Sequence, residues 1–330
     1  MRALVLSDQL SFDPNYPMPA PMPGEALIRV TRAGVCNTDL ELVKGYMRFR
    51  GVLGHEFVGV VESIMPADTE APTDIRPGDR VVGEINAVGP ASPSRHWHER
   101  AQDPTRTTLG IDRRDGVFAD YTRLPLVNLH RVPDTVSDDE AVFVEPLAAA
   151  CQILEQVHIT PTDRVAVLGD GKLGLLCAQV LATTACDLTV IGKHAAKLDI
   201  LRQRGINTFL LDIPGVSKTP GMSFDVVVEC TGAPAGFDLA RQLLRPRGTL
   251  VLKSTYEGLP QANLSMIVVD EITVVGSRCG PFAPALRLLA QKRVDVISLI
   301  HARYPLREGL RALEHAGRPG VLKVLLDIAS

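Results

Sequence analysis

The sequence lacks several features that would mark particular classes of protein. It has no apolar run of the roughly 20 residues that a membrane-spanning helix requires. Its first residues, MRALVLSDQL, have neither the long apolar core nor the small-residue cleavage site of a secretory signal. The six cysteines, at positions 36, 151, 177, 186, 230 and 279, show no paired spacing. We therefore expect a cytoplasmic protein with no membrane span and no disulfide framework.

The sequence also lacks an excess of charge of one sign. It has 35 Lys and Arg against 38 Asp and Glu, which gives a formal net charge of -3. Surfaces that bind nucleic acids or other polyanions are usually strongly basic, so we expect no nucleic-acid partner. The hydrophobic fraction of 45% and the charged fraction of 22% are ordinary for a globular protein. A small molecule is the expected partner.

Two domains are expected, because 330 residues exceed the usual size of one hydrophobic core. Residues 1–145 contain short apolar alternations broken by Pro and Gly, such as ALIRV and FVGVVE, which is typical of an irregular antiparallel β domain. Residues 146–276 alternate strand-like and helix-like runs, such as RVAVLG and LGLLCAQVLA, which predicts a parallel α/β sheet. Residues 277–330 add a helical run and a final strand.

A glycine-rich motif with the spacing G-x-G-x-x-G lies between a predicted strand and a predicted helix. The first glycine permits a tight turn, the second lets the backbone approach a pyrophosphate, and the third allows close helix–strand packing. The start of the helix then directs N–H groups at the phosphates. A glycine-rich turn that binds nothing is the alternative, but strand, spacing and helix all favour a dinucleotide site. Its predicted residues are Gly169, Gly171, Lys172, Leu173 and Gly174.

The next predicted strand, DLTVIG, bears on the choice of coenzyme. In this fold an acidic residue at the strand end usually binds the ribose hydroxyls of NAD. Here the strand ends in Gly192, Lys193 and His194. Without a carboxylate a 2′-phosphate is not repelled, and Lys193, with His194 and Lys197, could pair with it. The same residues could merely open the next helix, and dual use stays open, but the pattern favours NADP over NAD.

Four residues offer ligands for zinc, and they lie far apart in the sequence. They are Cys36 in AGVCNTDL, His55 and Glu56 in LGHEFVG, and Glu145 in VFVEPLAAA. A catalytic zinc takes about three protein ligands and keeps one position for water or substrate. Each residue alone is equally consistent with an ordinary core or surface position. Spacing without a fold does not show that the four side chains converge.

At these residues the chain resembles the medium-chain dehydrogenase/reductase family, specifically its zinc-dependent alcohol, polyol, threonine and sugar dehydrogenases. Matching stretches include GVCNTDLEL, GVLGHEFVGVV, RPGDRVVGE, VFVEPLAAA, AVLGDGKLG and VVGSRCG, in the family's order over nearly the whole chain. The resemblance implies an α/β protein with a GroES-like, β-rich catalytic domain over residues 1–145 and 277–330. It implies a Rossmann domain, a doubly wound parallel sheet, over residues 146–276, and a homodimer or homotetramer.

The resemblance also implies roles for particular residues. One catalytic zinc would be held by Cys36, His55 and either Glu56 or Glu145. Thr38 matches the hydroxyl that accepts the substrate proton, Asp39 would orient a ligand, and Glu41 stands near the place of a relay histidine in some alcohol dehydrogenases. Further coenzyme contacts are implied for Thr231, Gly232, Arg278 and Lys323.

Many relatives carry a structural zinc on four cysteines, which this chain lacks. The corresponding positions hold Gly89, Ser92, Arg95 and Asp103. His96 and His98 could assist a metal, but structural zinc sites favour thiolates, so a solvated loop is the better interpretation. We expect one zinc per subunit.

The implied function is hydride transfer between NAD(P) and an alcohol, with a polyol, sugar or other secondary alcohol favoured. Two alternatives are a zinc-free quinone or alkene reductase of the same superfamily and a catalytically silent dinucleotide-binding protein.

Overall fold

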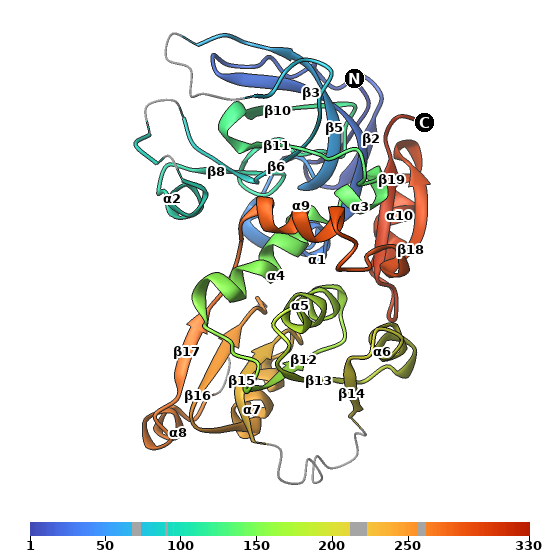
Figure 1. Cartoon of the computed structure of the whole chain (residues 1–330). Coiled ribbons are helices and arrows are strands. Elements are labelled where there is room, and N and C mark those ends of the chain that lie inside the picture. The colour runs from blue at the N-terminus through green and yellow to red at the C-terminus, as the bar shows by residue number, and fades with distance from the viewer. Residues whose placement is uncertain (68–73, 90–91, 95, 212–222, 256–261) are drawn as a thin grey trace. The chain divides into compact units, whose positions relative to one another are not determined.

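The computed structural model describes residues 1–67, 74–89, 92–94, 96–211, 223–255 and 262–330, and it divides the chain into two compact units (Figure 1). Unit 1 consists of Met1–Ala148 and Gly280–Ser330, and unit 2 consists of Ala149–Cys279. The boundaries expected from the sequence, after residues 145 and 276, lie three residues earlier in each case. The chain thus leaves unit 1, forms unit 2, and returns.

Unit 1 is built on a seven-stranded sheet. The strand order is β11-β6-β5-β3-β19-β18, and β10 pairs with β3 outside this path. The strands are β3 (Glu25–Val35), β5 (Glu56–Ile64), β6 (Arg80–Gly83), β10 (Tyr121–Pro125), β11 (Leu129–Arg131), β18 (Ile300–Pro305) and β19 (Lys323–Asp327). The first half of β3 pairs with β10 and its second half pairs with β19, both antiparallel. Strand β19 therefore completes the sheet on the side of β3 away from β5.

Two smaller sheets and several short helices complete unit 1. The sheets have the orders β2-β1-β4 and β7-β8-β9, with β1 (Ala3–Leu6), β2 (Leu10–Asp13), β4 (Gly51–Val52), β7 (Asn86–Ala87), β8 (Thr107–Leu109) and β9 (Arg113–Arg114). The α-helices are α1 (Asn37–Val43), α2 (Trp97–Gln102), α3 (Asp138–Ala141), α9 (Phe282–Ala290) and α10 (Gly309–Ala316). The 3-10 helices are η1 (Tyr46–Arg48), η2 (Leu126–Asn128), η3 (Ile297–Leu299) and η4 (Leu306–Glu308).

Unit 2 is a six-stranded sheet in which all neighbouring strands are parallel, with the order β14-β13-β12-β15-β16-β17. The strands are β12 (Arg164–Leu168), β13 (Asp187–Gly192), β14 (Asn207–Leu210), β15 (Phe224–Glu229), β16 (Leu244–Leu252) and β17 (Thr273–Gly276). The helices are α5 (Lys172–Ala182), α6 (Ala195–Arg202), α7 (Pro234–Leu243) and α8 (Leu264–Val269), and α4 (Val144–Gln156) leads into the unit.

The strand order of unit 2 fixes where a ligand is expected. From β12 the chain proceeds through β13 to β14 on one side, and then through β15 and β16 to β17 on the other. Ligands of open parallel sheets bind at the carboxyl ends of the strands where the order reverses, which here is the end of β12. Strand β12 is buried along Val165–Leu168, as its continuous apolar run predicts for a sheet covered on both faces. The glycine-rich segment follows directly.

The structure confirms the fold class expected from the sequence, which combines a β-rich unit with a doubly wound parallel sheet. Among the described residues, no helix has the length and apolar character needed to cross a bilayer.

Candidate metal and coenzyme sites

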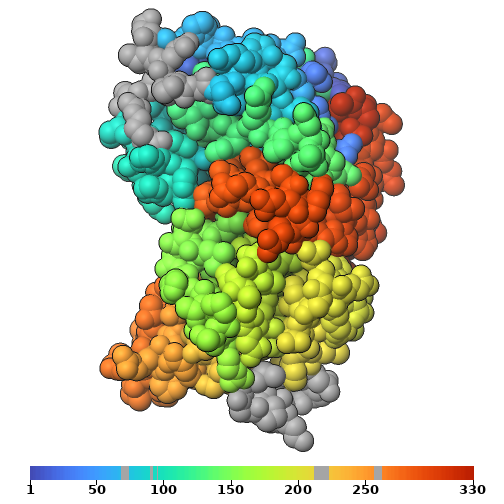
Figure 2. Space-filling model, in the orientation of Figure 1, coloured from blue at the N-terminus to red at the C-terminus, as the bar shows by residue number. Residues whose placement is uncertain are grey.

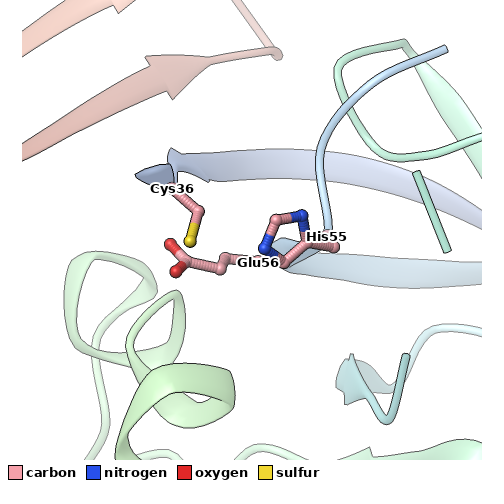
Figure 3. A group of neighbouring side chains, drawn as sticks. All are labelled: Cys36, His55 and Glu56. Atoms are coloured by element: carbon pink, nitrogen blue, oxygen red, sulfur yellow. The ribbon is translucent and has the colours of Figure 1, made fainter. Parts of the chain in front are cut away.

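Three of the four predicted zinc ligands meet in unit 1. The ligand atoms of Cys36, His55 and Glu56 all lie within 4.8 Å of one another (Figure 3). Cys36 follows the last residue of β3, while Glu56 is the first residue of β5, with His55 just before it. Because β3 and β5 pair antiparallel, with Gly34 opposite Glu56, the end of one strand lies beside the start of the other. The pairing register of β3 with β5 thus brings Cys36 close to His55 and Glu56, which lie about twenty residues later in the chain.

Two glycines make room for these side chains. A Cβ at Gly34 would lie 2.5 Å from Oε2 of Glu56, so any side chain there would displace the carboxylate. Gly54 has φ +94, which residues with a Cβ rarely adopt, and a Cβ there would also meet the ring of Phe118 at 2.4 Å. The left-handed turn at Gly54 precedes His55 and directs the chain into β5. These glycines serve the ligand geometry, because Gly34 leaves room for the Glu56 carboxylate and Gly54 turns the chain ahead of His55.

Asp39 supports two of the three ligands from the first turn of α1. Its Oδ2 accepts the backbone N–H of Cys36 at 2.8 Å, and its Oδ1 lies 3.3 Å from Nδ1 of His55. Both Asp39 and His55 are buried. Burial alone would lower the pKa of His55, but the Asp39 carboxylate and the Cys36 thiol raise it well above its usual value. An imidazole that presents Nδ1 to a carboxylate offers Nε2 to a metal.

This donor set fits a zinc ion. Thiolate, imidazole and carboxylate are the ligands that catalytic zinc takes, and three of them leave a position for substrate oxygen. Asp39 Oδ1 and His55 Nδ1 are buried 3.3 Å apart, and among the described residues neither atom makes a hydrogen bond of good geometry. Buried polar atoms normally have partners. A metal on the opposite nitrogen of His55 would fix the ring and its tautomer against Asp39.

Glu56 carries a second contact that the sequence did not predict. The ammonium of Lys323, the first residue of β19, donates a hydrogen bond to Oε2 of Glu56, and both side chains are almost fully buried. The resemblance implied that Lys323 contacts the coenzyme pyrophosphate. The structure places its ammonium inside unit 1, 5.6 Å from the centre of the Phe143 ring. The implied contact of Lys323 with the coenzyme stays a prediction.

The other predicted residues around the metal centre lie as follows. Glu145, in the first turn of α4, is not part of the three-residue donor group that the described residues form. Between the two carboxylates that the sequence left unranked, the geometry therefore favours Glu56. The hydroxyl of Thr38 lies 3.7 Å from the sulfur of Cys36. Glu41 pairs with Lys44 at 2.9 Å on the exposed side of α1.

The glycine-rich segment of unit 2 forms the expected strand, turn and helix. Gly169 has φ +121, and a Cβ there would lie 2.7 Å from the carbonyl oxygen of Cys230. Gly171 is the N-cap of α5, which begins with Lys172 and Leu173. A Cβ at Gly174 would lie 2.1 Å from the carbonyl oxygen of Gly169, so the helix packs closely on the turn. Each glycine has the position that a dinucleotide loop requires.

Asp170, between the first two glycines, is a residue that the sequence reasoning missed. Its Oδ2 accepts the backbone N–H groups of Lys193 at 2.7 Å and His194 at 2.6 Å. The ring Nδ1 of His194 lies 3.0 Å from Oδ1. A carboxylate therefore stands at the end of β13 after all, supplied by a different loop. The sequence signal was the acidic residue inside the glycine motif itself.

Thr231 and Gly232 follow β15, next to Cys230. The carboxylate of the buried Glu229 accepts the backbone N–H of Thr231 at 2.6 Å and also the Thr231 hydroxyl. The N–H of Gly232 donates to the hydroxyl of Ser254 at 2.8 Å. These bonds hold the turn after β15 at the carboxyl edge of the sheet, where a coenzyme is expected. Arg278, two residues after β17, is exposed.

Asp103 organises the segment that corresponds to the structural-zinc site of many relatives. We call the described part of residues 89–105 the lobe. Its carboxylate accepts hydrogen bonds from the hydroxyls of Ser92 at 2.6 Å, Ser94 at 2.8 Å and Thr105 at 2.6 Å, and from the backbone N–H of Thr105 at 2.7 Å. These bonds lower the pKa of Asp103 to below its usual range. His96 and His98 stack on each other at 5.7 Å, and both are exposed. Arg95 lies outside the described residues.

Comparison with known proteins identifies the family. A family model described as "Alcohol dehydrogenase GroES-like domain" matches residues 22–134, and one described as "Zinc-binding dehydrogenase" matches residues 173–291. A protein named sorbitol dehydrogenase from Halalkalibacterium halodurans is 31% identical over 327 residues, covering 93% of each chain. The chain belongs to the zinc-binding dehydrogenases. A human protein named sorbitol dehydrogenase is 27% identical, over 94% of this chain and 91% of its own.

Solved structures agree with this assignment. The alcohol dehydrogenase TADH from Thermus sp. ATN1 has a TM-score of 0.86 at 28% identity, covering 99% of both chains. A putative zinc-binding dehydrogenase from Sinorhizobium meliloti, solved with NADP bound, has a TM-score of 0.86 at 26% identity, also over 99% of both chains. The predictions of a zinc-type alcohol dehydrogenase that uses a nicotinamide dinucleotide are confirmed by these relatives. The protein is thus an oxidoreductase that acts on a small molecule.

Proposed function

We propose that this dehydrogenase oxidises a secondary hydroxyl of a polyol or sugar alcohol and transfers the hydride to a nicotinamide dinucleotide. The observation that carries the chemistry is the convergence of Cys36, His55 and Glu56 on one chain with a dinucleotide loop. The relatives named sorbitol dehydrogenase and D-arabitol-phosphate dehydrogenase support the substrate class. A zinc-free reductase would have no need of this donor set.

The residues in and around the donor set have separate roles in the proposed reaction. Cys36, His55 and Glu56 would hold the zinc ion, which when bound would supply Lewis-acid polarisation of a substrate oxygen. The family resemblance gives Thr38 the role of taking the substrate proton, and its hydroxyl lies 3.7 Å from the Cys36 sulfur at the start of α1. Asp39 holds His55 in one orientation through the 3.3 Å contact to Nδ1.

The coenzyme is held by the loop from Gly169 to Gly174, with Thr231 and Gly232 at the neighbouring strand end. Backbone N–H groups at the start of α5 bind the pyrophosphate, and the left-handed Gly169 lets the chain turn beneath it. The sequence favours NADP over NAD, and the residues at the end of β13 bear on that expectation in opposite ways. Lys193 at the end of β13 supports it, whereas the nearby Asp170 carboxylate opposes it.

We also propose that the protein is a homodimer joined at the edge of the unit 2 sheet. Strand β17 is the last strand of the described sheet order and carries the exposed Val274, and the helix that precedes it in the chain, α8, carries the exposed Leu264, Val268 and Val269. Figure 2 shows the segment around α8 at the surface, in orange. An apolar surface next to an open strand edge is typical of strand pairing between subunits. In the part of the chain that the structure describes, no cysteine forms a disulfide bond, which suits a cytoplasmic location.

One assay tests the substrate class. The purified, zinc-loaded protein is given NAD or NADP with sorbitol, arabitol, galactitol, a polyol phosphate, 2,3-butanediol, threonine and ethanol, and reduced coenzyme is followed by absorbance. We expect the highest kcat/KM with a polyol or its phosphate. Turnover of threonine or ethanol above every polyol would contradict the proposal.

A further inference from the structure

Asp170 reaches from the glycine-rich loop to the end of the next strand. Its Oδ2 accepts two backbone N–H groups, from Lys193 at 2.7 Å and from His194 at 2.6 Å. Its Oδ1 and Oδ2 lie 3.0 Å and 3.1 Å from Nδ1 of the His194 ring. The carboxylate therefore belongs spatially to the turn between β13 and α6, although it comes from a loop more than twenty residues earlier.

Gly192 gives this carboxylate its room. A Cβ at Gly192 would lie 2.6 Å from both Cβ and Oδ2 of Asp170. Any other residue at the strand end would thus push Asp170 out of its position. The usual arrangement of the fold, with an acidic side chain on the strand end and a small residue in the loop, is reversed here. The glycine-rich loop contributes the carboxylate of Asp170, and Gly192 at the end of β13 leaves the space for it.

The Asp170 carboxylate carries a negative charge that burial and hydrogen bonds hold in one position. Asp170 is only 7% exposed. Burial alone would raise the pKa of the Asp170 carboxyl, but the hydrogen bonds from His194 and Lys193, together with the His194 charge, lower it. A carboxylate has capacity for about four donors, whereas among the described residues Oδ1 is contacted only by the His194 ring, at 3.0 Å. It is therefore able to accept a further hydrogen bond from a sugar hydroxyl.

The basic side chains near the turn between β13 and α6 are more exposed to solvent than Asp170 is. The side chains of Lys193 and His194 are exposed, and that of Lys197 is half-buried on the first turns of α6. The His194 ring is engaged with the Asp170 carboxylate itself. A dianionic 2′-phosphate placed here would meet a buried negative charge, whereas the positive charges of this turn are screened by solvent. A 2′-hydroxyl would instead find an acceptor.

We propose that Asp170 is the specificity-determining residue for the coenzyme, and that its carboxylate selects NAD over NADP by accepting the ribose hydroxyls and repelling a 2′-phosphate. This inference rests on the proposed function, since it concerns the same dinucleotide site. It reverses the preference expected from the sequence, because that expectation took the strand end to lack a carboxylate.

The test measures coenzyme binding rather than turnover. Dissociation constants for NADH and NADPH are determined by fluorescence titration of the zinc-loaded protein, without alcohol. We expect NADH to bind at least about tenfold more tightly than NADPH, and Asp170→Asn to reduce that ratio by about tenfold, mainly through tighter NADPH binding. Asp170→Ser, which keeps an oxygen acceptor but no charge, should act in the same direction.

Asp187→Asn is the matched control. Asp187 is the first residue of β13, so it has the same charge on the same strand but at the opposite end, and its side chain is 61% exposed. This change should leave the NADH/NADPH ratio unaltered. Tighter NADPH than NADH binding by the unchanged protein would overturn the proposal. An equal loss of both affinities in Asp170→Asn would also overturn it, because that result means that Asp170 only shapes the loop.

The result is independent of the substrate assay. A protein that discriminates between the coenzymes as expected but oxidises no polyol would refute the proposed substrate and leave the role of Asp170 intact. A polyol dehydrogenase that prefers NADPH would refute the role of Asp170 alone.

Discussion

The Lys323 ammonium is paired with the Glu56 carboxylate inside unit 1, where their side chains are 2% and 1% exposed. The pair lies directly beside the donor set, since Glu56 is one of its three members. Lys323 comes from β19 and Glu56 from β5, on opposite sides of β3 in the sheet. Strand β19, the last strand in the chain, thus supplies the positive charge that pairs with the Glu56 carboxylate at the metal centre.

Replacing Lys323 by Met should destabilise the zinc-free protein more than the zinc-loaded protein. Without the ammonium the buried Glu56 carboxylate has lost its ion-pair partner, which typically costs about 3–5 kcal/mol, whereas a bound cation would partly neutralise it. Thermal unfolding with and without a chelator measures the difference. Lys44→Met, at the exposed pair with Glu41, is the control and should cost less than about 1 kcal/mol. Equal losses in both metal states would contradict this explanation.

Replacing Cys36 by Ser should remove the zinc and lower kcat/KM by more than about a hundredfold, because a neutral hydroxyl is a far poorer zinc ligand than a thiolate. Coenzyme affinity should be retained, since the dinucleotide loop lies in unit 2. Metal analysis, alcohol turnover and NADH titration give the three readouts. Cys186→Ser, a half-buried thiol outside the donor set, should keep zinc and activity. Normal turnover by a zinc-free Cys36 variant would exclude the proposed chemistry.

The lobe around Asp103 should be stable without a metal and resistant to acid. Because the folded-state pKa of Asp103 is lowered, its contribution to stability is present above the unfolded-state pKa of about 3.9 and is lost as the pH falls through the lower folded value. Asp103→Asn should therefore speed amide exchange of the lobe at neutral pH, and the difference from the unchanged protein should vanish in strong acid. Metal analysis should give one zinc per chain. Two zinc ions per chain, or a chelator effect on the lobe, would contradict this prediction.

A charge on α8 should disrupt the proposed dimer. Val268 is 77% exposed beside the strand edge, and Val268→Glu would place like charges opposite each other in a symmetric interface. We expect the mass measured by light scattering after gel filtration to fall to that of one 35.7 kDa chain. Met22→Glu, at an equally apolar and 51% exposed position in unit 1, should leave the mass unchanged. A monomeric unchanged protein would refute the dimer directly.

The dinucleotide loop was predictable from sequence because its determinants are local. Strand, glycine spacing and helix lie within one continuous segment, and Gly169, Gly171 and Gly174 have the positions that their spacing indicates. The Cys36–His55–Glu56 group was not predictable from spacing alone, because its convergence depends on the pairing register of β3 with β5. Only the family resemblance bridged that gap. The choice between Glu56 and Glu145 needed three-dimensional geometry.

Asp170 and Lys323 show what sequence reasoning leaves out. Both act through side chains that cross to a distant segment, Asp170 to the end of β13 and Lys323 to the start of β5. The rule that reads coenzyme choice from the strand end assumes that the acid belongs to that strand. A carboxylate from a neighbouring loop satisfies the same electrostatics, and no pattern along the chain shows where its side chain points.

The return of the chain to unit 1 has a consequence for biosynthesis. Strand β19 pairs with β3, yet all of unit 2 lies between them in the chain. On the ribosome unit 2 can therefore fold while the sheet of unit 1 still lacks a strand and Glu56 still lacks its ammonium partner. Strand β19 follows β3 by nearly three hundred residues, so the complete sheet of unit 1 and the Lys323–Glu56 pair are expected to form only after unit 2 has been synthesised.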